Sequence, residues 1–207
     1  MLLVGLTGSI GMGKSTTATM FKQHNFAVYN ADDTVHYIYE NDDIIINKIN
    51  RAFPGSKVDG KVSRNFLKGE LNNNPKRFKE LELIIHPATR EYQISFINQM
   101  IEKGCEGCIL DIPLLFETGG EKYVDTSIVV TASKETQFQR VIGERGLDED
   151  LFNKILLQQM PDEEKCKRAD YVISSNTSIE ETRKEVEDIV TNLTLIEPKA
   201  WNSFYKK

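Results

Sequence analysis

Short apolar segments recur along the chain and alternate with segments whose apolar residues repeat at helical spacing. Apolar runs of this length are typical of buried strands, and strands that alternate with helices favour a parallel sheet. We therefore predict an α/β domain with a five-stranded parallel sheet covered by helices on both faces. The predicted strands are Leu2–Leu6, Phe26–Tyr29, Cys108–Pro113, Thr126–Thr131 and Tyr171–Ser174.

Residues 34–104 depart from this alternation and are mostly helical in pattern. Ile45, Ile49 and Phe53 share one helical face, and Asp59-Gly60 marks a tight turn. So many helices between two strands exceed a simple crossover connection. We expect an inserted lobe over the glycine-rich loop described below, where a second substrate could bind.

Prolines divide the second half of this insert. Pro75 restarts a helix, and His86-Pro87 is expected to interrupt it, because proline restricts the residue before it. We interpret His86 first as a structural hinge, and alternatively as a residue that shares an anionic ligand with Arg90, one turn further on. The buried stripe predicted for this helix is Phe78, Leu81, Ile84 and Ile85.

Residues 136–167 have the composition of a mobile lid, being dense in Lys, Arg and Glu and bounded by Gly and Pro. Ser133 is expected to cap a helix that carries Arg140, and Gly146 to end it. Asp148 is expected to start a second helix, which Pro161 ends. The alternative is a solvated helical hairpin with ordinary surface charges.

The stretch Gly8-Ser9-Ile10-Gly11-Met12-Gly13-Lys14-Ser15 joins the first predicted strand to the first predicted helix. Its two spaced glycines, followed by Lys and Ser, have the pattern of a phosphate-binding loop. Glycine lets the backbone wrap a phosphate with its N–H groups inward, and the helix adds its positive dipole end. Lys14 would reach the outer phosphates of a nucleoside triphosphate, and the Ser15 hydroxyl would ligate Mg²⁺. A chance glycine-rich turn is the alternative, disfavoured by the strand before and the helix after.

Two carboxylates follow predicted strands, at the edge where ligands of open α/β sheets bind. Asp32 follows the second strand and is a candidate for the chemistry. Alternatively it caps the next helix, a task it could share with Asp33. Asp111 closes the third strand, where it would complete the Mg²⁺ shell opposite Ser15, directly or through water.

The composition is that of a soluble globular protein. The chain has 207 residues, 40% of them hydrophobic, and a formal net charge of −5, which argues against a broad nucleic-acid surface. The first apolar run is too short for a signal peptide, and no apolar stretch approaches membrane-spanning length. We expect a cytoplasmic protein with no membrane association and infer no obligate protein partner.

Cys105 and Cys108 have the C-x-x-C spacing of zinc and redox sites. A zinc site needs a second ligand pair, and neither Cys166 nor the scattered histidines supply the matching spacing. A redox pair would stand at a helix N-terminus, whereas this pair leads into an apolar run. We predict incidental thiols at the mouth of a buried strand, and no metal.

Six motifs extend over nearly the whole chain: Gly5-Leu6-Thr7-Gly8 through Lys14-Ser15-Thr16, Ala31-Asp32, His86-Pro87, Asp111-Ile112-Pro113-Leu114-Leu115-Phe116-Glu117, Gln137 through Arg140, and Arg168-Ala169-Asp170-Tyr171-Val172-Ile173 with Asn176. Together they resemble the dephospho-coenzyme A kinases. The resemblance implies transfer of the ATP γ-phosphoryl group to the ribose 3′-hydroxyl of dephospho-coenzyme A, the last step of coenzyme A synthesis.

The resemblance also implies roles for individual residues. Asp32 would orient and deprotonate the acceptor hydroxyl, Lys14 would hold the outer phosphates, and Arg140 would close with the lid onto the transferring group. Asn176 would lie near adenine. The ATP phosphates would be held by Gly11, Met12, Gly13, Lys14, Ser15 and Thr16, and the acceptor would face His86, Arg90, Leu114, Phe116 and Glu117.

The implied architecture is a single P-loop kinase domain over residues 1–207. Its core would comprise residues 1–33, 105–135 and 168–207, with an acceptor-binding insert over 34–104 and a lid over 136–167. One departure is Asn30, where the family commonly has an acid. Because asparagine cannot accept a proton at neutral pH, the base role falls on Asp32 alone.

Two competing functions remain open at this point. Another small-molecule P-loop kinase, acting on a nucleotide, a sugar acid or shikimate, would share the loop, the aspartate and the lid. A nucleotide-hydrolysing regulatory switch would need a water-positioning element and a base-specific motif such as Asn-Lys-x-Asp, which the sequence lacks.

Overall fold

The computed structural model describes residues 1–205. The chain divides into two compact units: a larger one made of Met1–Tyr29 and the residues from Met100 onwards, and a smaller one, Asn30–Gln99. Because the boundary lies at the end of the second strand, the smaller unit is an insertion in the chain of the larger one.

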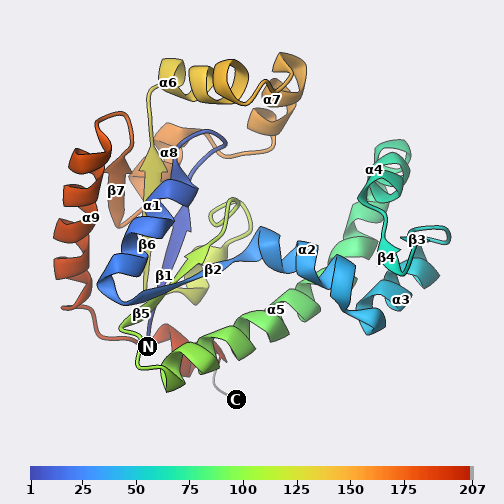
Figure 1. Cartoon of the computed structure of the whole chain (residues 1–207), viewed down its shortest axis with the longest axis horizontal. Helices are drawn as coiled ribbons and strands as arrows, with labels where there is room; N and C mark the ends of the chain where they lie inside the picture. Colours follow the sequence, from blue (N-terminus) through green and yellow to red (C-terminus); the bar gives the residue numbers. More distant parts are fainter. Residues whose placement is uncertain (206–207) are drawn as a thin grey trace. The chain divides into compact units, whose positions relative to one another are not determined.

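The larger unit is built on a five-stranded sheet in the order β2-β5-β1-β6-β7 (Figure 1). β1 pairs in parallel with both β5 and β6, and β6 pairs in parallel with β7. The five predicted strands are confirmed, with small shifts at their ends. They are β1 Leu2–Thr7, β2 Phe26–Asn30, β5 Gly107–Asp111, β6 Thr126–Thr131 and β7 Tyr171–Ser174.

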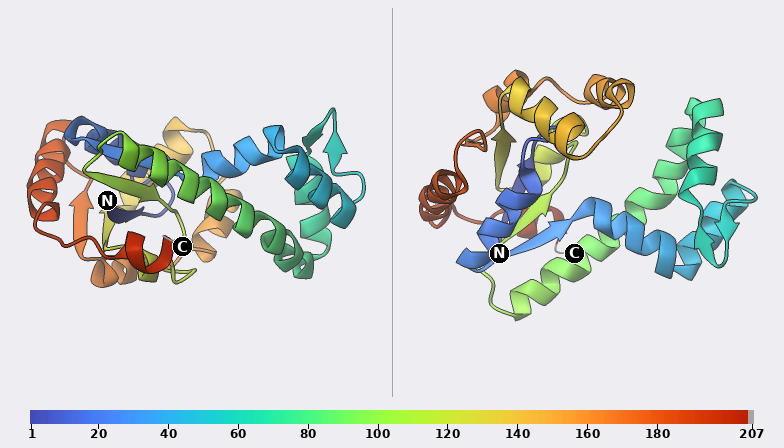
Figure 2. Two further views of the ribbon diagram at one scale, coloured as in Figure 1. Left: turned by 90° about the horizontal axis from the view of Figure 1, so that it is seen from below. Right: turned by 45° about the horizontal axis from the view of Figure 1, so that its top comes forward.

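Two helices cover one face of this sheet. α1 (Lys14–Phe21), with a short 3₁₀ turn over Lys22–His24, lies beside α9 (Ile179–Leu193), as both views in Figure 2 show. Alternate residues of β1 point into the core beneath them, where they meet buried side chains from both helices. A capping box starts α9, and the hydrogen bonds from the Ser178 backbone and hydroxyl lower the pKa of Glu181.

The opposite face is covered by a loop and a short helix. Leu115 is fully buried and packs so closely on β1 that a Cβ at Gly5 would lie 2.8 Å from its Cδ2 atom. α8 (Asp162–Arg168) contacts β6. Helices and loops therefore cover both faces, which confirms the predicted α/β class. Short helical turns over Gly120–Tyr123 and Trp201–Tyr205 complete the larger unit.

The segment 136–167 begins and ends its helices largely where predicted. Ser133 caps α6 (Lys134–Phe138), which continues as a π-helical turn over Gln139–Glu144. Gly146 takes a left-handed φ of 63°, and Asp148 caps α7 (Glu149–Leu157). α8 was not predicted, because Pro161, expected to end the preceding helix, is also the residue before the start of this one.

The three cysteines are free thiols. Cys108 lies on β5 with no exposed surface, and burial raises the pKa of its thiol to about 12. A thiol with so high a pKa stays protonated at neutral pH, as expected of a cysteine in a buried strand.

The smaller unit is a helical body with one hairpin and its own core. The buried residues include Ile46 and all three residues of the predicted helical face, Ile45, Ile49 and Phe53, which confirms that prediction. Asp59 and Gly60 both have positive φ at the turn between β3 and β4, as the sequence predicts. Its elements are α2 Ala31–Asn41, α3 Asp43–Ala52, β3 Lys57–Val58, β4 Lys61–Val62, α4 Arg64–Asn73, a 3₁₀ turn Pro75–Arg77, and α5 Phe78–Glu102 up to Gln99.

Two expectations for α5 are wrong. The helix runs without interruption through His86-Pro87, and Phe78 is 52% exposed instead of buried. Leu81 and Ile85 before the proline and Ala88 after it are all buried, so one packed face continues across it. A proline inside a helix removes one helical hydrogen bond and typically costs about 3 kcal/mol of stability. Burial of the apolar face on both sides of Pro87 outweighs this cost.

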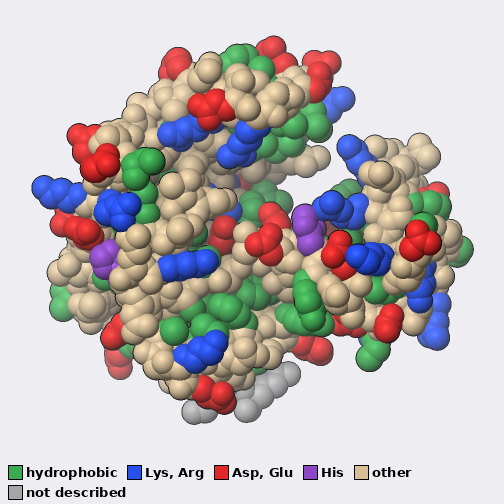
Figure 3. All heavy atoms as spheres, viewed as in Figure 1, with side chains coloured by type: hydrophobic (Ala, Val, Ile, Leu, Met, Phe, Trp, Pro, Cys, Tyr) green, Lys and Arg blue, Asp and Glu red, His purple; other side chains and the backbone are tan. Residues whose placement is uncertain are grey.

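The surface carries charges of both signs, with acidic and basic side chains interspersed over the face drawn in Figure 3. Within residues 1–205, no helix combines the length and the apolar character needed to cross a membrane.

Candidate active site

The glycine-rich loop connects β1 to α1 in the predicted order of strand, loop and helix. Gly11 and Gly13 have φ of 79° and 84°, a region that strains residues with a Cβ. Space forbids a side chain as well: a Cβ at Gly11 would lie 2.5 Å from Val141 Cγ2, and one at Gly13 would lie 2.9 Å from Ser175 Oγ. Both glycines are therefore required for the loop to pack as it does.

Lys14 forms an ion pair with Asp111 at the carboxyl end of β5. The register of β1 and β5 pairs Leu6 with Asp111, which brings this carboxylate level with the start of the loop. Ser15 and Thr16 lie in the first turn of α1 and are exposed. The structure therefore brings together the predicted phosphate loop and the predicted metal ligand, with Lys14 as the direct partner of Asp111.

Side chains distant in sequence bind three successive carbonyl groups of the loop. Gln137 Nε2 donates to the Ile10 carbonyl at 2.7 Å. Arg140 Nη1 donates to the Gly11 carbonyl at 3.4 Å, and Ser175 Oγ donates to the Met12 carbonyl at 2.8 Å. These three carbonyls thus accept from side chains, while the N–H groups in the first turn of α1 have no acceptor within the helix.

Arg140 is itself held at the loop by Ser175. Its Nη1 atom donates to Ser175 Oγ at 2.8 Å and its Nη2 atom to the Ser175 carbonyl at 2.6 Å. The predicted lid arginine thus lies at the phosphate loop. Asn176, the next residue, accepts hydrogen bonds from the Ser133 N–H at 3.2 Å and the Thr136 hydroxyl at 2.6 Å, at the start of α6.

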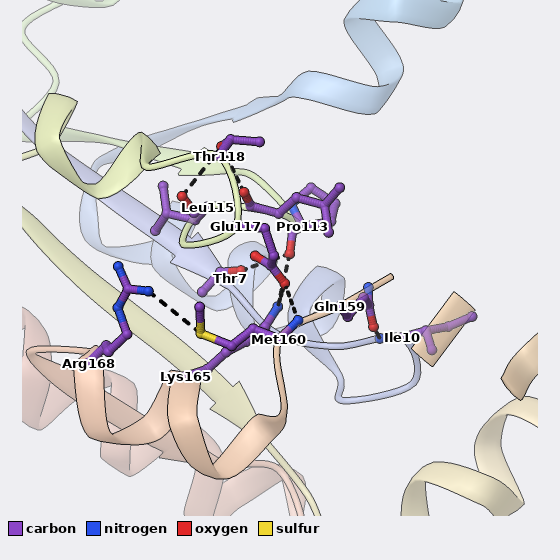
Figure 4. Close-up of polar contacts among 11 residues, drawn as sticks. Thr7, Ile10, Pro113, Leu115, Glu117, Thr118, Gln159, Met160, Lys165 and Arg168 are labelled. Carbon is purple, nitrogen blue, oxygen red and sulfur yellow. Dashed lines mark hydrogen bonds and ion pairs between the residues drawn. The ribbon is translucent and has the colours of Figure 1, made fainter. Parts of the chain in front are cut away.

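A buried ion pair ties the loop after β5 to α8 (Figure 4). Lys165 has no exposed surface, and its ammonium group lies 2.9 Å from Glu117 Oε1 and 3.2 Å from the Pro113 carbonyl. Glu117 Oε1 also accepts the Met160 N–H at 2.7 Å, and Thr7 donates to the Pro113 carbonyl at 3.0 Å. The predicted acceptor-binding residue Glu117 thus has an ionic partner within the protein.

The other residues of that loop differ in exposure. Phe116 is 4% exposed, and the Arg168 guanidinium lies 4.9 Å from the centre of its ring, a cation–π contact. Leu114 is 38% exposed. Of the two, only Leu114 offers a large apolar surface to solvent.

The remaining predicted site residues belong to the smaller unit. Asp32 lies in the first turn of α2 with its side chain exposed. The cap of α2 is Asn30, whose Oδ1 accepts the Asp33 N–H at 3.0 Å, so the alternative role of Asp32 or Asp33 as the cap is wrong. His86 is exposed on α5, and Arg90 lies one turn further on, partly buried.

Two cavities of the larger unit adjoin the loop. One of about 430 Å³ is lined by Ser15 and Thr16 together with residues of α1 and α9, among them Arg183. The other, of about 600 Å³, lies against Ser9 and Met12 and is bounded by α6, α7 and the start of α8. Both volumes lie in the range of small-molecule sites.

Sequence reasoning assigned no role to Gln137, Gln159 or Ser175. Gln137, Arg140 and Val141 share one helical face, and a glutamine on the buried side of a helix was the available signal. Ser175 follows the carboxyl end of β7, the edge of the sheet where ligands bind. Gln159 lies between helices and carries no comparable signal.

A parallel sheet whose first strand leads through a glycine-rich loop to Lys14 and Ser15, with an aspartate closing the neighbouring strand, defines a P-loop nucleotide-binding domain. Within this class, residues 2–181 match the family model described as dephospho-CoA kinase. The chain belongs to the dephospho-CoA kinase family. This confirms the resemblance inferred from the motifs and implies ATP as the phosphoryl donor.

Relatives and solved structures agree with this family. A dephospho-CoA kinase of Rhodopseudomonas palustris is 44% identical over 190 residues, which cover 92% of this chain and 94% of the relative. One from Agrobacterium fabrum is 42% identical over 193 residues, covering 93% and 98%. The crystal structure of TT1252 from Thermus thermophilus has a TM-score of 0.83 and 31% identity, covering 92% and 96%. A dephospho-CoA kinase from Campylobacter jejuni has a TM-score of 0.67 and 26% identity, covering 93% and 97%.

Proposed function

We propose that this chain transfers the γ-phosphoryl group of ATP to the ribose 3′-hydroxyl of dephospho-coenzyme A, giving coenzyme A and ADP. The observation that carries the proposal is the phosphate loop with Lys14 beside Asp111, in a chain that matches the dephospho-CoA kinase family over residues 2–181. Phosphoryl transfer asks a protein mainly for positioning and for stabilisation of charge, which this arrangement can supply.

The ATP phosphates would bind at residues 11–16, from Gly11 to Thr16. Lys14, Ser15 and Thr16 begin α1, where the backbone N–H groups lack helical partners and the helix dipole favours an anion. Lys14 would hold the outer phosphates, and Asn176 would lie near adenine. The cavity lined by Ser15 and Thr16 begins at this end of α1 and extends along the helix to Gln23.

Asp32 would act on the acceptor. It follows the carboxyl end of β2, the position in the chain at which ligand-binding residues of open α/β sheets occur. In the proposed step the 3′-oxygen forms a bond to the γ-phosphorus, the bond from that phosphorus to the ADP oxygen breaks, and the hydroxyl proton passes to the Asp32 carboxylate. The acceptor would be bound by His86, Arg90, Leu114, Phe116 and Glu117.

Arg140 would stabilise the charge that develops on the transferring group. Its guanidinium already lies at the loop, bonded to Ser175 and to the Gly11 carbonyl, so a small rearrangement would exchange these contacts for phosphoryl oxygens. An arginine in this role typically raises the rate by about a thousandfold or more. We propose residues 136–167 as the lid that carries it, residues 34–104 as the acceptor-binding insert, and the remainder as the core.

Magnesium is proposed as the metal of the reaction. The Ser15 hydroxyl and the Asp111 carboxylate are both hard oxygen donors of the kind that Mg²⁺ prefers, and they fit this ion. Bound there, Mg²⁺ would neutralise charge on the β- and γ-phosphates. We further propose that the enzyme acts in the cytoplasm, where ATP is available.

An ADP-release assay with Mg-ATP, run with and without dephospho-coenzyme A and with product identification by mass, tests the proposal. We expect ADP release that depends on the acceptor, with coenzyme A as the product. No stimulation by this acceptor would overturn the assigned substrate, and equal ATP turnover without any acceptor would favour a regulatory switch.

A further inference from the structure

We propose that Gln137 and Gln159 are positioning residues that hold Ile10 from two sides and so set the phosphate-binding conformation of the loop. Gln137 Nε2 donates to the Ile10 carbonyl at 2.7 Å. Gln159 Oε1 accepts the Ile10 N–H at 3.2 Å. Both polar backbone groups of one loop residue are thus bound by side-chain amides.

These two bonds act on different peptide groups. The Ile10 N–H belongs to the peptide that joins Ser9 to Ile10, and the Ile10 carbonyl belongs to the peptide that joins Ile10 to Gly11. Because a peptide group is planar, a bond to each fixes the rotations on both sides of Ile10. The entry into Gly11, which needs its positive φ, is therefore held in place before a phosphate binds.

The bond that Gln159 accepts from Ile10 also decides which N–H groups of the loop meet the phosphates. With its own N–H engaged, Ile10 contributes none, and the anion is left to the residues from Gly11 onwards. A neutral amide suits this position, because a carboxylate would place a negative charge beside a triphosphate.

The two glutamines come from opposite ends of the segment 136–167. Gln137 lies on α6, one helical turn before Arg140, and Gln159 lies between α7 and α8. The residue after Gln159 is Met160, whose N–H binds Glu117. Gln159 and Met160 therefore connect the phosphate loop to the loop after β5. Because Gln137 and Gln159 lie in different parts of the segment 136–167, a shift of either part changes the hydrogen bonds to Ile10.

The inference deepens the proposed function, on which it rests for ATP as the ligand of the loop. The test is ATP affinity, measured by calorimetry without acceptor, for Gln137→Met, Gln159→Met and the control Gln158→Met. Methionine keeps the length of glutamine and loses the amide. Gln158 is the exposed neighbour of Gln159 and has no side-chain hydrogen bond among the described residues.

We expect each of the first two variants to weaken ATP binding by about fivefold to tenfold, the usual effect of one lost hydrogen bond to a positioned group. The control should leave the affinity unchanged. Thermal unfolding midpoints and the KM for dephospho-coenzyme A should stay near those of the unaltered chain, which separates positioning of the loop from general stability. Affinities within twofold of the control for both methionine variants would overturn the inference.

A second pair of variants separates the hydrogen bond from charge. Gln159→Glu keeps an oxygen that accepts the Ile10 N–H, whereas Gln137→Glu sets a carboxylate against the Ile10 carbonyl. Both add one negative charge, so Gln137→Glu should weaken ATP binding more. Equal losses would count against the inference, and the half-exposed Gln159 keeps the test available if variants of the buried Gln137 unfold.

Failure of the proposed function gives a different result. If the unaltered chain binds ATP but releases no ADP in response to dephospho-coenzyme A, the acceptor assignment fails while the comparison of ATP affinities still decides the role of the glutamines. If the unaltered chain binds no ATP, both proposals fail.

Discussion

Lys14 and Asp111 form an ion pair in which both side chains are largely buried, with exposures of 14% and 3%. Burying a charge is costly unless an opposite charge lies beside it. The carboxylate at the end of β5 therefore lets the loop keep a buried ammonium group, and the ammonium group does the same for the carboxylate. The two residues proposed to handle phosphate and metal are thus mutually dependent.

Asp111→Asn tests this dependence, because asparagine keeps the shape of the side chain and removes its charge. We expect metal-free ATP to bind about threefold to tenfold more tightly to the variant. Asparagine binds the Lys14 ammonium group more weakly than aspartate does, so less free energy is lost when Lys14 turns to a phosphate oxygen. Turnover with Mg-ATP should fall, because the proposed metal ligand is lost. ATP titrations in excess EDTA and steady-state rates in Mg²⁺ measure the two effects. Metal-free binding that is unchanged or weaker would contradict the ion pair's role.

Asp32→Asn should abolish transfer and leave ATP affinity largely intact. The substitution removes the proposed base, whose contribution to such a reaction is about a hundredfold to ten-thousandfold. Asp33→Asn is the matched control. Asp33 is exposed in the same turn of α2, and its substitution removes the same charge near the helix N-terminus. Steady-state rates with both substrates are the readout. Near-normal turnover by Asp32→Asn would remove this residue from the mechanism.

Substitutions of Asn30 test whether asparagine stands in place of the family's usual acid because it caps α2. Its side chain caps α2, a role that aspartate fills equally well. We expect Asn30→Asp to unfold at nearly the same denaturant concentration as the unaltered chain, and Asn30→Ala to lose about 1 kcal/mol of folding free energy. Urea titrations measure both. A loss of stability in Asn30→Asp similar to that in Asn30→Ala would show that the cap does not explain asparagine here.

Features that depend on neighbouring residues were predictable from the sequence. The five strands follow from apolar runs, and the caps at Ser133 and Asp148 follow from side chains that bind N–H groups within the same turn. The cap of α2, offered as the alternative role of Asp32 or Asp33, is instead Asn30. Asn30 precedes the helix and Asp32 lies in its first turn, and both residue types are favoured caps. Local pattern alone cannot choose between them.

Features that depend on packing were not predictable. Pro87 stays inside α5 because a buried face continues on both sides of it, and that face exists only in the folded unit. The contacts of Gln137 and Gln159 with Ile10 join residues 127 and 149 positions apart. The loop motif gives expected roles for Lys14 and Ser15, and it holds no information about which distant side chains support the loop.

The ion pair between Glu117 and Lys165 gives a prediction about stability. Glu117→Gln leaves the ammonium group of Lys165 without a charged partner in a place with no exposed surface, and breaking a buried pair in this way typically costs about 3–5 kcal/mol. Lys165→Met should be milder, because Glu117 Oε1 keeps the Met160 N–H as a hydrogen-bond donor when the ammonium group is removed. The double variant, Glu117→Gln with Lys165→Met, should recover most of the loss caused by Glu117→Gln.

Urea unfolding of the three variants and the unaltered chain forms a double-mutant cycle that isolates the interaction between the two side chains. If Glu117 instead serves mainly the acceptor, Glu117→Gln will keep its stability and raise the KM for dephospho-coenzyme A, and the double variant will not restore it. Recovery of stability in the double variant, with the KM for the acceptor unchanged throughout, would assign Glu117 to the support of the loop after β5. The loss of stability follows from burial of the charge, whereas a change in KM would follow only from contact with the acceptor, so the two measurements discriminate between the roles.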